Sequence, residues 1–174
     1  MLQVLQKSRA GIQKDVDLRV AGLVLQKLLI LNGPNLNLLG LREPAIYGAV
    51  TLGGLKQLCV NAGLTQNFEI DFRQTNAEHE LVDWLQQAGL EGLIVVLNAG
   101  AYSHTSIALA DAIKGAQTQV IEVHISNIHA REAFRHHSYV SAVAKGVIVG
   151  LGVEGYSLAI KAAATLRDAL PIKA

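Results

Sequence analysis

The run of residues 93–97, with the sequence LIVVL, limits the possible folds of this chain more than any other stretch. It is continuously apolar and is bounded by Gly92 and Asn98. A strand covered on both faces has this composition, whereas a strand with one face in water alternates apolar and polar residues. Such strands occur in parallel sheets that carry helices on both faces, so the run predicts an α/β fold.

Four further strand-like segments alternate with helical patterns. We expect strands at 28–31, 68–72, 119–123 and 146–150, helices at 51–62, 76–88, 105–114 and 153–170, and a helical turn near 131–134. In the second helix, Asn76 is the expected N-cap and Gly89 the expected end. Right-handed crossovers between five strands favour a flavodoxin-like three-layer sandwich, with a parallel sheet of order 2-1-3-4-5.

The length of 174 residues fits one domain with its own core. Residues 1–26 carry six charged side chains and read as a peripheral extension, which leaves residues 27–174 as a single catalytic domain. The net charge of +1 argues against nucleic acid and anionic membrane surfaces as partners. The single cysteine, Cys59, excludes an internal disulfide framework and reads as a buried apolar residue. No apolar run is long enough to span a bilayer, and we expect a cytoplasmic protein.

The connection after the first strand, residues 32–48, is far longer than most strand-to-helix loops. We expect an ordered anchor at 32–37 and a mobile flap at 39–48. Arg42 and Tyr47 lie on the flap, where a guanidinium can lower the pKa of a phenol and so make it a base. A surface arginine and a tyrosine that only anchors the loop are the alternative, and spacing alone favours that alternative.

Polar side chains follow the other strands, and ligands bind at the carboxyl ends of open parallel sheets. Glu122 and His124 share one strand face, where a carboxylate can orient an imidazole that acts as a general acid. A structural Glu–His hydrogen bond explains the same spacing equally well. Asn35, Asn98 and His104 either bind a substrate or serve turns and caps. Arg135 is the favoured anion or hydroxyl ligand of a His-rich stretch in which a metal site has little support.

Five stretches taken in order closely resemble the type II 3-dehydroquinate dehydratases, also called type II dehydroquinases. They read LLILNGPNLNLLGLREPAIYG, RQTNAEHELVDWLQQA, LNAGAYSHTSIALADAI, IEVHISNIHAREAFRHHSYVS and GVIVGLGVEGYSLAI. The resemblance implies reversible anti elimination of water from 3-dehydroquinate through an enolate, giving 3-dehydroshikimate in the shikimate pathway or in quinate breakdown. It implies a homododecamer built from trimers, and no metal, imine or other cofactor.

The resemblance also implies residue roles. Tyr47 matches the base that takes the C2 proton, Arg42 the group that lowers its pKa, and His124 the acid that protonates the departing C1 hydroxyl. Glu122 matches the residue that orients this acid, and Asn35 the one that stabilises the enolate through a water. The remaining matches are substrate-binding positions, with Asp111 reaching the site of a neighbouring subunit: Asn98, His104, Asp111, Ile125, Ser126 and Arg135.

Two other function classes stay open on the residues alone. A flavodoxin-like binding protein would hold a flavin or nucleotide without chemistry, although residues 32–40 match neither a phosphate loop nor a dinucleotide fingerprint. A catalytically silent homologue or scaffold is the third possibility, and the full set of catalytic residue types argues against it.

Overall fold

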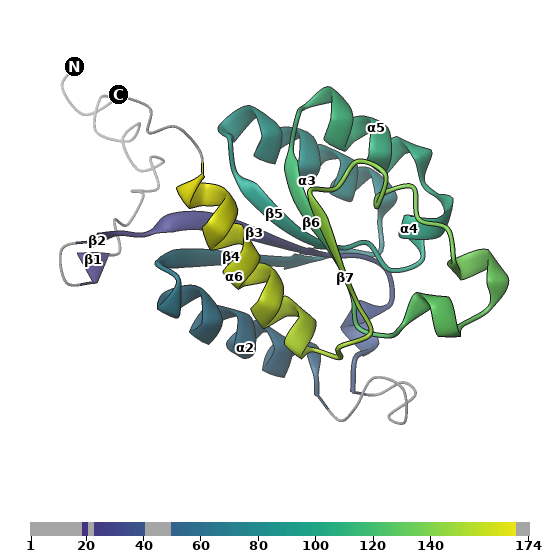
Figure 1. Cartoon of the computed structure of the whole chain (residues 1–174), viewed down its shortest axis with the longest axis horizontal. Coiled ribbons are helices and arrows are strands. Elements are labelled where there is room, and N and C mark those ends of the chain that lie inside the picture. The colour runs from purple at the N-terminus through teal and green to yellow at the C-terminus, as the bar shows by residue number, and fades with distance from the viewer. Residues whose placement is uncertain (1–18, 21–22, 41–49, 170–174) are drawn as a thin grey trace, which may run out of the picture.

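The structure is a computed structural model that describes residues 19–20, 23–40 and 50–169. Its centre is a parallel sheet of five strands in the order β4-β3-β5-β6-β7 (Figure 1). The strands are β3 (Gln26–Asn32), β4 (Phe68–Gln74), β5 (Ile94–Asn98), β6 (Gln119–His124) and β7 (Gly146–Val149). Numbered along the chain, this is the predicted order 2-1-3-4-5, and the flavodoxin-like prediction is confirmed.

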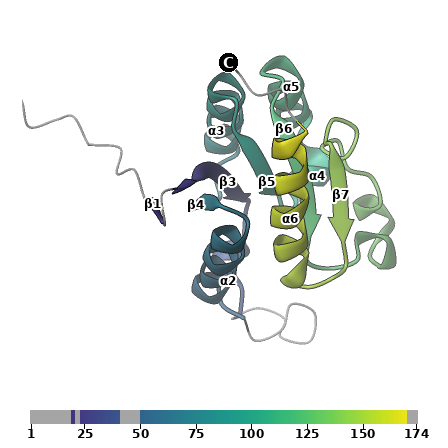
Figure 2. The same ribbon diagram turned by 60° about the vertical axis from the view of Figure 1, so that its left-hand side comes forward.

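Helices cover both faces of the sheet, as the apolar run in β5 predicts (Figures 1 and 2). α2 (Leu52–Thr65) and α6 (Glu154–Asp168) pack together on one face. α3 (Glu78–Glu91) and α5 (Ile107–Gly115) pack together on the other. Two short strands, β1 (Arg19–Val20) and β2 (Leu23–Val24), pair antiparallel outside the central sheet.

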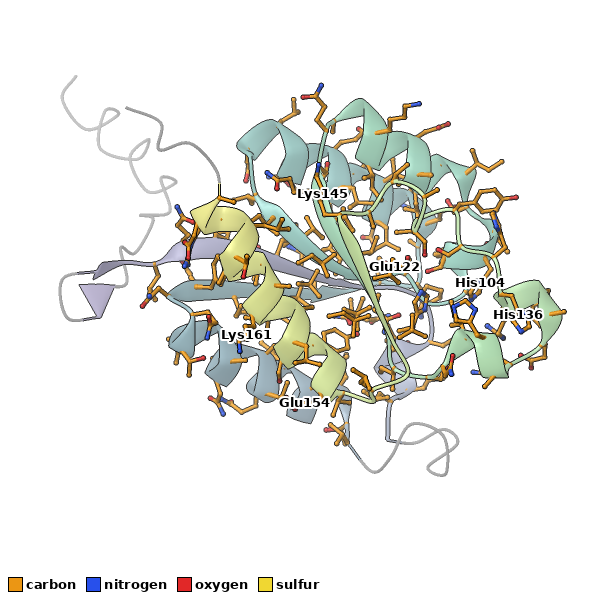
Figure 3. The ribbon with its side chains drawn as sticks, viewed as in Figure 1. His104, Glu122, His136, Lys145, Glu154 and Lys161 are labelled. Carbon is orange, nitrogen blue, oxygen red and sulfur yellow. The ribbon has the colours of Figure 1, made fainter. Side chains whose placement is uncertain are left out.

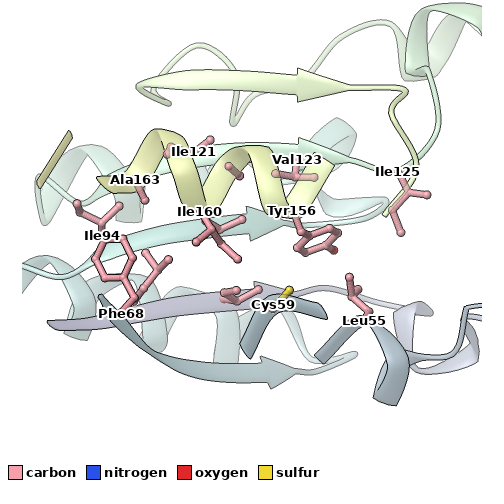
Figure 4. Close-up of a cluster of buried hydrophobic side chains, with 14 of the residues drawn as sticks. Leu55, Cys59, Phe68, Ile94, Ile121, Val123, Ile125, Tyr156, Ile160 and Ala163 are labelled. Atoms are coloured by element: carbon pink, nitrogen blue, oxygen red, sulfur yellow. The ribbon is translucent and has the colours of Figure 1, made fainter. Parts of the chain in front are cut away.

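The strand period of two divides the core into two apolar layers. In β3, Leu28 and Ile30 face α2 and α6, whereas Leu29 and Leu31 face α3 and α5. Figure 4 shows the first layer, in which Cys59 packs as the sequence predicts. Burial raises the pKa of its thiol to about 12, so this cysteine is an inert apolar side chain.

The predicted ends of α3 are wrong at both termini. The helix runs through Gly89 to Glu91, and Gly92 ends it in the left-handed conformation with φ of 69°. Gly89 is a contact point instead, since a Cβ there would lie 2.3 Å from the carbonyl oxygen of Ala116. The N-cap is Ala77, because the side chain of Asn76 accepts a hydrogen bond from the backbone of Asn35.

Two other segments differ from the predicted elements. The helix expected at 105–114 is divided into α4 (Tyr102–Thr105) and α5, because Ser106 leaves the helical conformation and caps α5 through the N–H of Leu109. The turn expected near 131–134 is two 3-10 turns, η2 (Ile128–Ala130) and η3 (Ala133–Arg135). Both differences add polar backbone near the carboxyl ends of β5 and β6.

Candidate active site

The carboxyl ends of β3, β5 and β6 open into one cavity of about 200 Å³. Close approach of the first two strand ends depends on Gly33, where a Cβ would lie 2.4 Å from the carbonyl oxygen of Ala99. Figure 3 shows Glu122 and His104 on the side of the molecule where these strands end. Seven of the residues predicted for the site line the cavity: Asn35, Asn98, His104, His124, Ile125, Ser126 and Arg135.

The loop after β3 supplies the first wall of the cavity. Asn35 has a left-handed backbone with φ of 67°, and its N–H donates to Oδ1 of Asn76 at 2.9 Å. The 3-10 turn η1 (Leu36–Leu38) follows. Leu39, which we expected on the flap, is 5% exposed and packs in the core beneath α2, so it belongs to the anchor. Arg42 and Tyr47 lie outside the described residues, and their pairing remains a prediction.

Glu122 and His124 form the hydrogen bond that their spacing predicts. Nε2 of His124 lies 2.8 Å from Oε1 of Glu122, and the carboxylate is fully buried beneath the cavity wall. Ser138 donates to the same oxygen at 2.7 Å, and Ser141 donates to Oε2. Burial alone would raise the pKa of Glu122, but the hydrogen bonds from His124, Ser141 and Ser138 outweigh it and hold this pKa below its usual value.

His104 lies within α4 and faces His124. The two rings are stacked, with centroids 6.0 Å apart and planes 19° from parallel. Nδ1 of His104 is 2.8 Å from the carbonyl oxygen of His137, which fixes it as a donor. Burial lowers the pKa of His104, and repulsion from His124 and Arg135 lowers it further. The hydrogen bond to the backbone of His137 raises this pKa but does not outweigh these effects. His104 is therefore a neutral imidazole at pH 7 that can offer Nε2 to a ligand.

A buried hydrogen-bond chain sets the orientation of Asn98. The hydroxyl of Tyr156 on α6 donates to Oδ1 of Asn32 at 2.7 Å, so it must accept from Nδ2 of Asn98 at 2.9 Å. Oδ1 of Asn98 accepts from the N–H of Gly100 at 3.2 Å. Burial raises the pKa of Tyr156 far above its usual value, so it stays a neutral hydroxyl. One N–H of Asn98 is left to face the cavity.

Comparison with known proteins shows the family of this chain. Residues 26–164 match the family described as dehydroquinase class II. The chain is 59% identical over 143 residues to the 3-dehydroquinate dehydratase of Variovorax paradoxus strain S110, covering 79% of this chain and 98% of that one. It is 57% identical over 139 residues to the enzyme of the same name from Brucella canis, covering 80% and 88%. The chain belongs to the class II dehydroquinase family.

Solved structures with similar sequences share the fold. The type II dehydroquinase of Propionibacterium acnes superposes with a TM-score of 0.78 at 47% identity, covering 80% of this chain and 97% of that one. A 3-dehydroquinate dehydratase-like protein from Bifidobacterium longum gives a TM-score of 0.63 at 35% identity, covering 83% and 99%.

Two residues predicted for the dehydroquinase site do not line its cavity. Glu122 lies behind His124, as its predicted orienting role requires. Asp111 lies on the exposed side of α5, outside the cavity of its own chain. Among the residues that the structure describes, no three His, Cys, Asp or Glu side chains are grouped to hold a metal ion. None of the described helices is long and apolar enough to cross a membrane.

Four residues in or behind the cavity wall were not predicted from the sequence. Arg131 lines the cavity beside Arg135. Ser138 and Ser141 bind the carboxylate of Glu122, and Tyr156 binds Asn98. A signal exists for Tyr156, because it is the one residue with a polar tip in the apolar stripe of α6. The two serines have no comparable signal, since isolated serines in a loop serve mostly as turn residues.

Proposed function

We propose that this chain eliminates water from 3-dehydroquinate, the compound in the names of its relatives, to give 3-dehydroshikimate. The observation that carries the proposal is the His124–Glu122 pair at the wall of the cavity. Elimination of a hydroxyl group needs a proton donor, because hydroxide is a poor leaving group. An imidazole held by a buried carboxylate is such a donor. The reaction serves the shikimate pathway or quinate breakdown.

His124 is the general acid in this proposal. Its Nε2 is occupied by Glu122, so Nδ1 is the nitrogen that transfers a proton. The C1–O bond breaks, the hydroxyl oxygen takes the Nδ1 proton, and water leaves. Glu122 stays ionised throughout and stabilises the imidazolium before the transfer, which matches the low pKa of its carboxyl. The neutral His104 binds a substrate hydroxyl beside it.

Tyr47 is the base, with Arg42 lowering its pKa. The phenolate takes the C2 proton, and the electron pair moves into an enolate at the C3 carbonyl before the C1–O bond breaks. Both residues lie in the segment 41–49. The flanking residues support their role, because Leu39 lines the cavity and a Cβ on Gly40 would lie 3.1 Å from the carbonyl oxygen of Val50. The loop therefore leaves and rejoins the fold beside the cavity.

The remaining residues bind the substrate. Backbone N–H groups of Ile125 and Ser126 hold the carboxylate, and Asn98, His104 and Arg135 bind hydroxyl groups. Asn35 stabilises the enolate through a water, since a preorganised donor is most effective where charge develops. All six line the cavity.

The active assembly in this proposal is a cytoplasmic dodecamer built from trimers. We place the catalytic domain at residues 27–174 together with Gln26, the first residue of β3, and the rest of the predicted extension outside it. Asp111 reaches the cavity of a neighbouring subunit, which is consistent with its exposed position on α5. The exposed apolar side chains of Ile107 and Leu151 are candidates for contacts between subunits.

The test is turnover of 3-dehydroquinate, followed by the absorbance of the enone product, with the native mass measured on the same sample. We expect turnover by the wild type and a mass of twelve subunits. Tyr47→Phe removes the base and should lower kcat by about two orders of magnitude or more. Tyr139→Phe, at a tyrosine outside the cavity, is the control and should retain activity. A wild type without turnover, or Tyr47→Phe at the wild-type rate, would contradict the proposal.

A further inference from the structure

The carboxylate of Glu122 accepts more hydrogen bonds than the orientation of His124 requires. Oε1 accepts from Nε2 of His124 and from Ser138, and Oε2 accepts from Ser141. Neither serine lines the cavity. Ser138 is 8% exposed, and its oxygen also accepts from the N–H of Ser141 at 3.2 Å. Its hydroxyl has one proton, which it donates to Glu122.

Three donors on one buried carboxyl specify its charge state. A carboxylate accepts all three hydrogen bonds as charge-assisted bonds, which are stronger than the bonds that a neutral carboxyl accepts. Burial acts in the opposite direction, because it disfavours the charged form. Without the serines, the carboxyl would keep one donor, His124, against the whole effect of burial. The proton shared by the two side chains could then move to Glu122.

We propose that Ser138 and Ser141 are positioning residues that hold Glu122 as a carboxylate and so keep the shared proton on His124. This inference rests on the proposed function for the role of His124 as the acid. It adds that the protonation state of His124 is determined by two serines of the segment between η3 and β7. A proton on Glu122 would leave His124 as a neutral imidazole, which is a far weaker proton donor.

The same segment also contacts α4. The N–H of Tyr139 donates to the carbonyl of Ser103 at 2.9 Å, and the carbonyl of His137 binds His104. In the described part of the chain, the ionisable group that binds Glu122 is His124. His104 stacks on His124 from α4, and Arg135 on η3 acts on His104. Replacing the two serines leaves His124, His104 and Arg135 in place. A change in the protonation of Glu122 is then due to the loss of the two hydroxyls.

The test is the pH dependence of kcat for wild type and for Ser138→Ala/Ser141→Ala. The serines lower the pKa of Glu122, so replacing them with alanine raises this pKa. As the pH is lowered, the kcat of the double variant should therefore begin to fall at a higher pH than the kcat of wild type. We expect this acid limb, the part of the profile where kcat falls with pH, to move up by about one pH unit. At a given pH on the limb, the kcat of the double variant is then roughly tenfold lower than that of wild type. Ser141→Thr retains a hydroxyl and should restore most of the wild-type profile relative to Ser141→Ala.

Ser106→Ala is the matched control for stability, because it removes a buried hydroxyl that caps α5 without contacting Glu122. It should lower the melting temperature and leave the acid limb in place. An unchanged limb in the folded double variant would overturn the proposal, as would an equal shift in Ser106→Ala.

A second readout is independent of turnover. Infrared difference spectra recorded against pH report the protonated carboxyl of Glu122, assigned by its loss in Glu122→Gln. The band should grow at higher pH in the double variant than in wild type, and identical midpoints would overturn the proposal. A wild type without turnover would contradict the proposed function alone, since this titration still tests the two serines.

Discussion

At the scale of the residue, the site consists of polar side chains whose orientation is set by a second set of buried polar groups. Tyr156 holds Asn98, and Ser138 and Ser141 hold Glu122. The sequence predicted seven of the residues that line the cavity, because their types suit catalysis and they follow strands. It did not predict the residues behind them, since such contacts join positions far apart in the chain, such as Asn98 and Tyr156, which are separated by 58 positions.

Tyr156→Phe tests the orientation of Asn98. It removes one hydroxyl and leaves Oδ1 of Asn32 and an N–H of Asn98 unsatisfied in the core, so we expect a loss of about 1–3 kcal/mol in the free energy of unfolding. The freed amide should raise KM severalfold more than it lowers kcat. Urea unfolding and steady-state kinetics measure both effects. Tyr102→Phe, which loses a bond to the carbonyl of Asn76 at the surface, should change neither strongly. An unchanged KM in Tyr156→Phe would refute the positioning role.

At the scale of the element, apolar patterns predicted all five strands of the sheet, and the preference for right-handed crossovers predicted their order. The predicted helix ends were less accurate. Gly89 and Gly115 illustrate the reason, because both occur at the end of an apolar helical pattern. Gly115 is the last residue of α5, whereas α3 continues through Gly89, which lies against Ala116 and Thr118. The sequence does not distinguish a glycine that ends a helix from one that admits a neighbouring chain segment.

Alanine at these two glycines should have opposite effects on stability. In Gly89→Ala the new Cβ would lie 2.3 Å from a backbone oxygen, which should cost about 1–3 kcal/mol of unfolding free energy. Gly115→Ala meets no atom within 4 Å and should be neutral or stabilising by up to about 1 kcal/mol. Denaturant unfolding of both variants measures the difference. Equal effects would show that the contact at Gly89 is unimportant.

At the scale of the whole molecule, the cavity lies where a parallel sheet places its ligands, and its described lining comes from four separate parts of the chain. These are the anchor after β3, the end of β5 with α4, the end of β6, and the segment containing η3. The flap with Arg42 and Tyr47 and the contribution of Asp111 from a neighbouring subunit remain predictions. A cavity with the acid on its rigid wall and the base on a closing loop would bring both charges together only after water is excluded.

The most direct test of the account is the kcat of His124→Gln with 3-dehydroquinate. Glutamine can still donate a hydrogen bond to Glu122, but it has no proton to transfer to the leaving hydroxyl. We predict a kcat lower by about two to four orders of magnitude, with an unfolding temperature close to that of wild type. His129→Gln, at an exposed histidine outside the cavity, should retain the wild-type rate. A His124→Gln enzyme whose kcat lies within about tenfold of wild type would contradict the account.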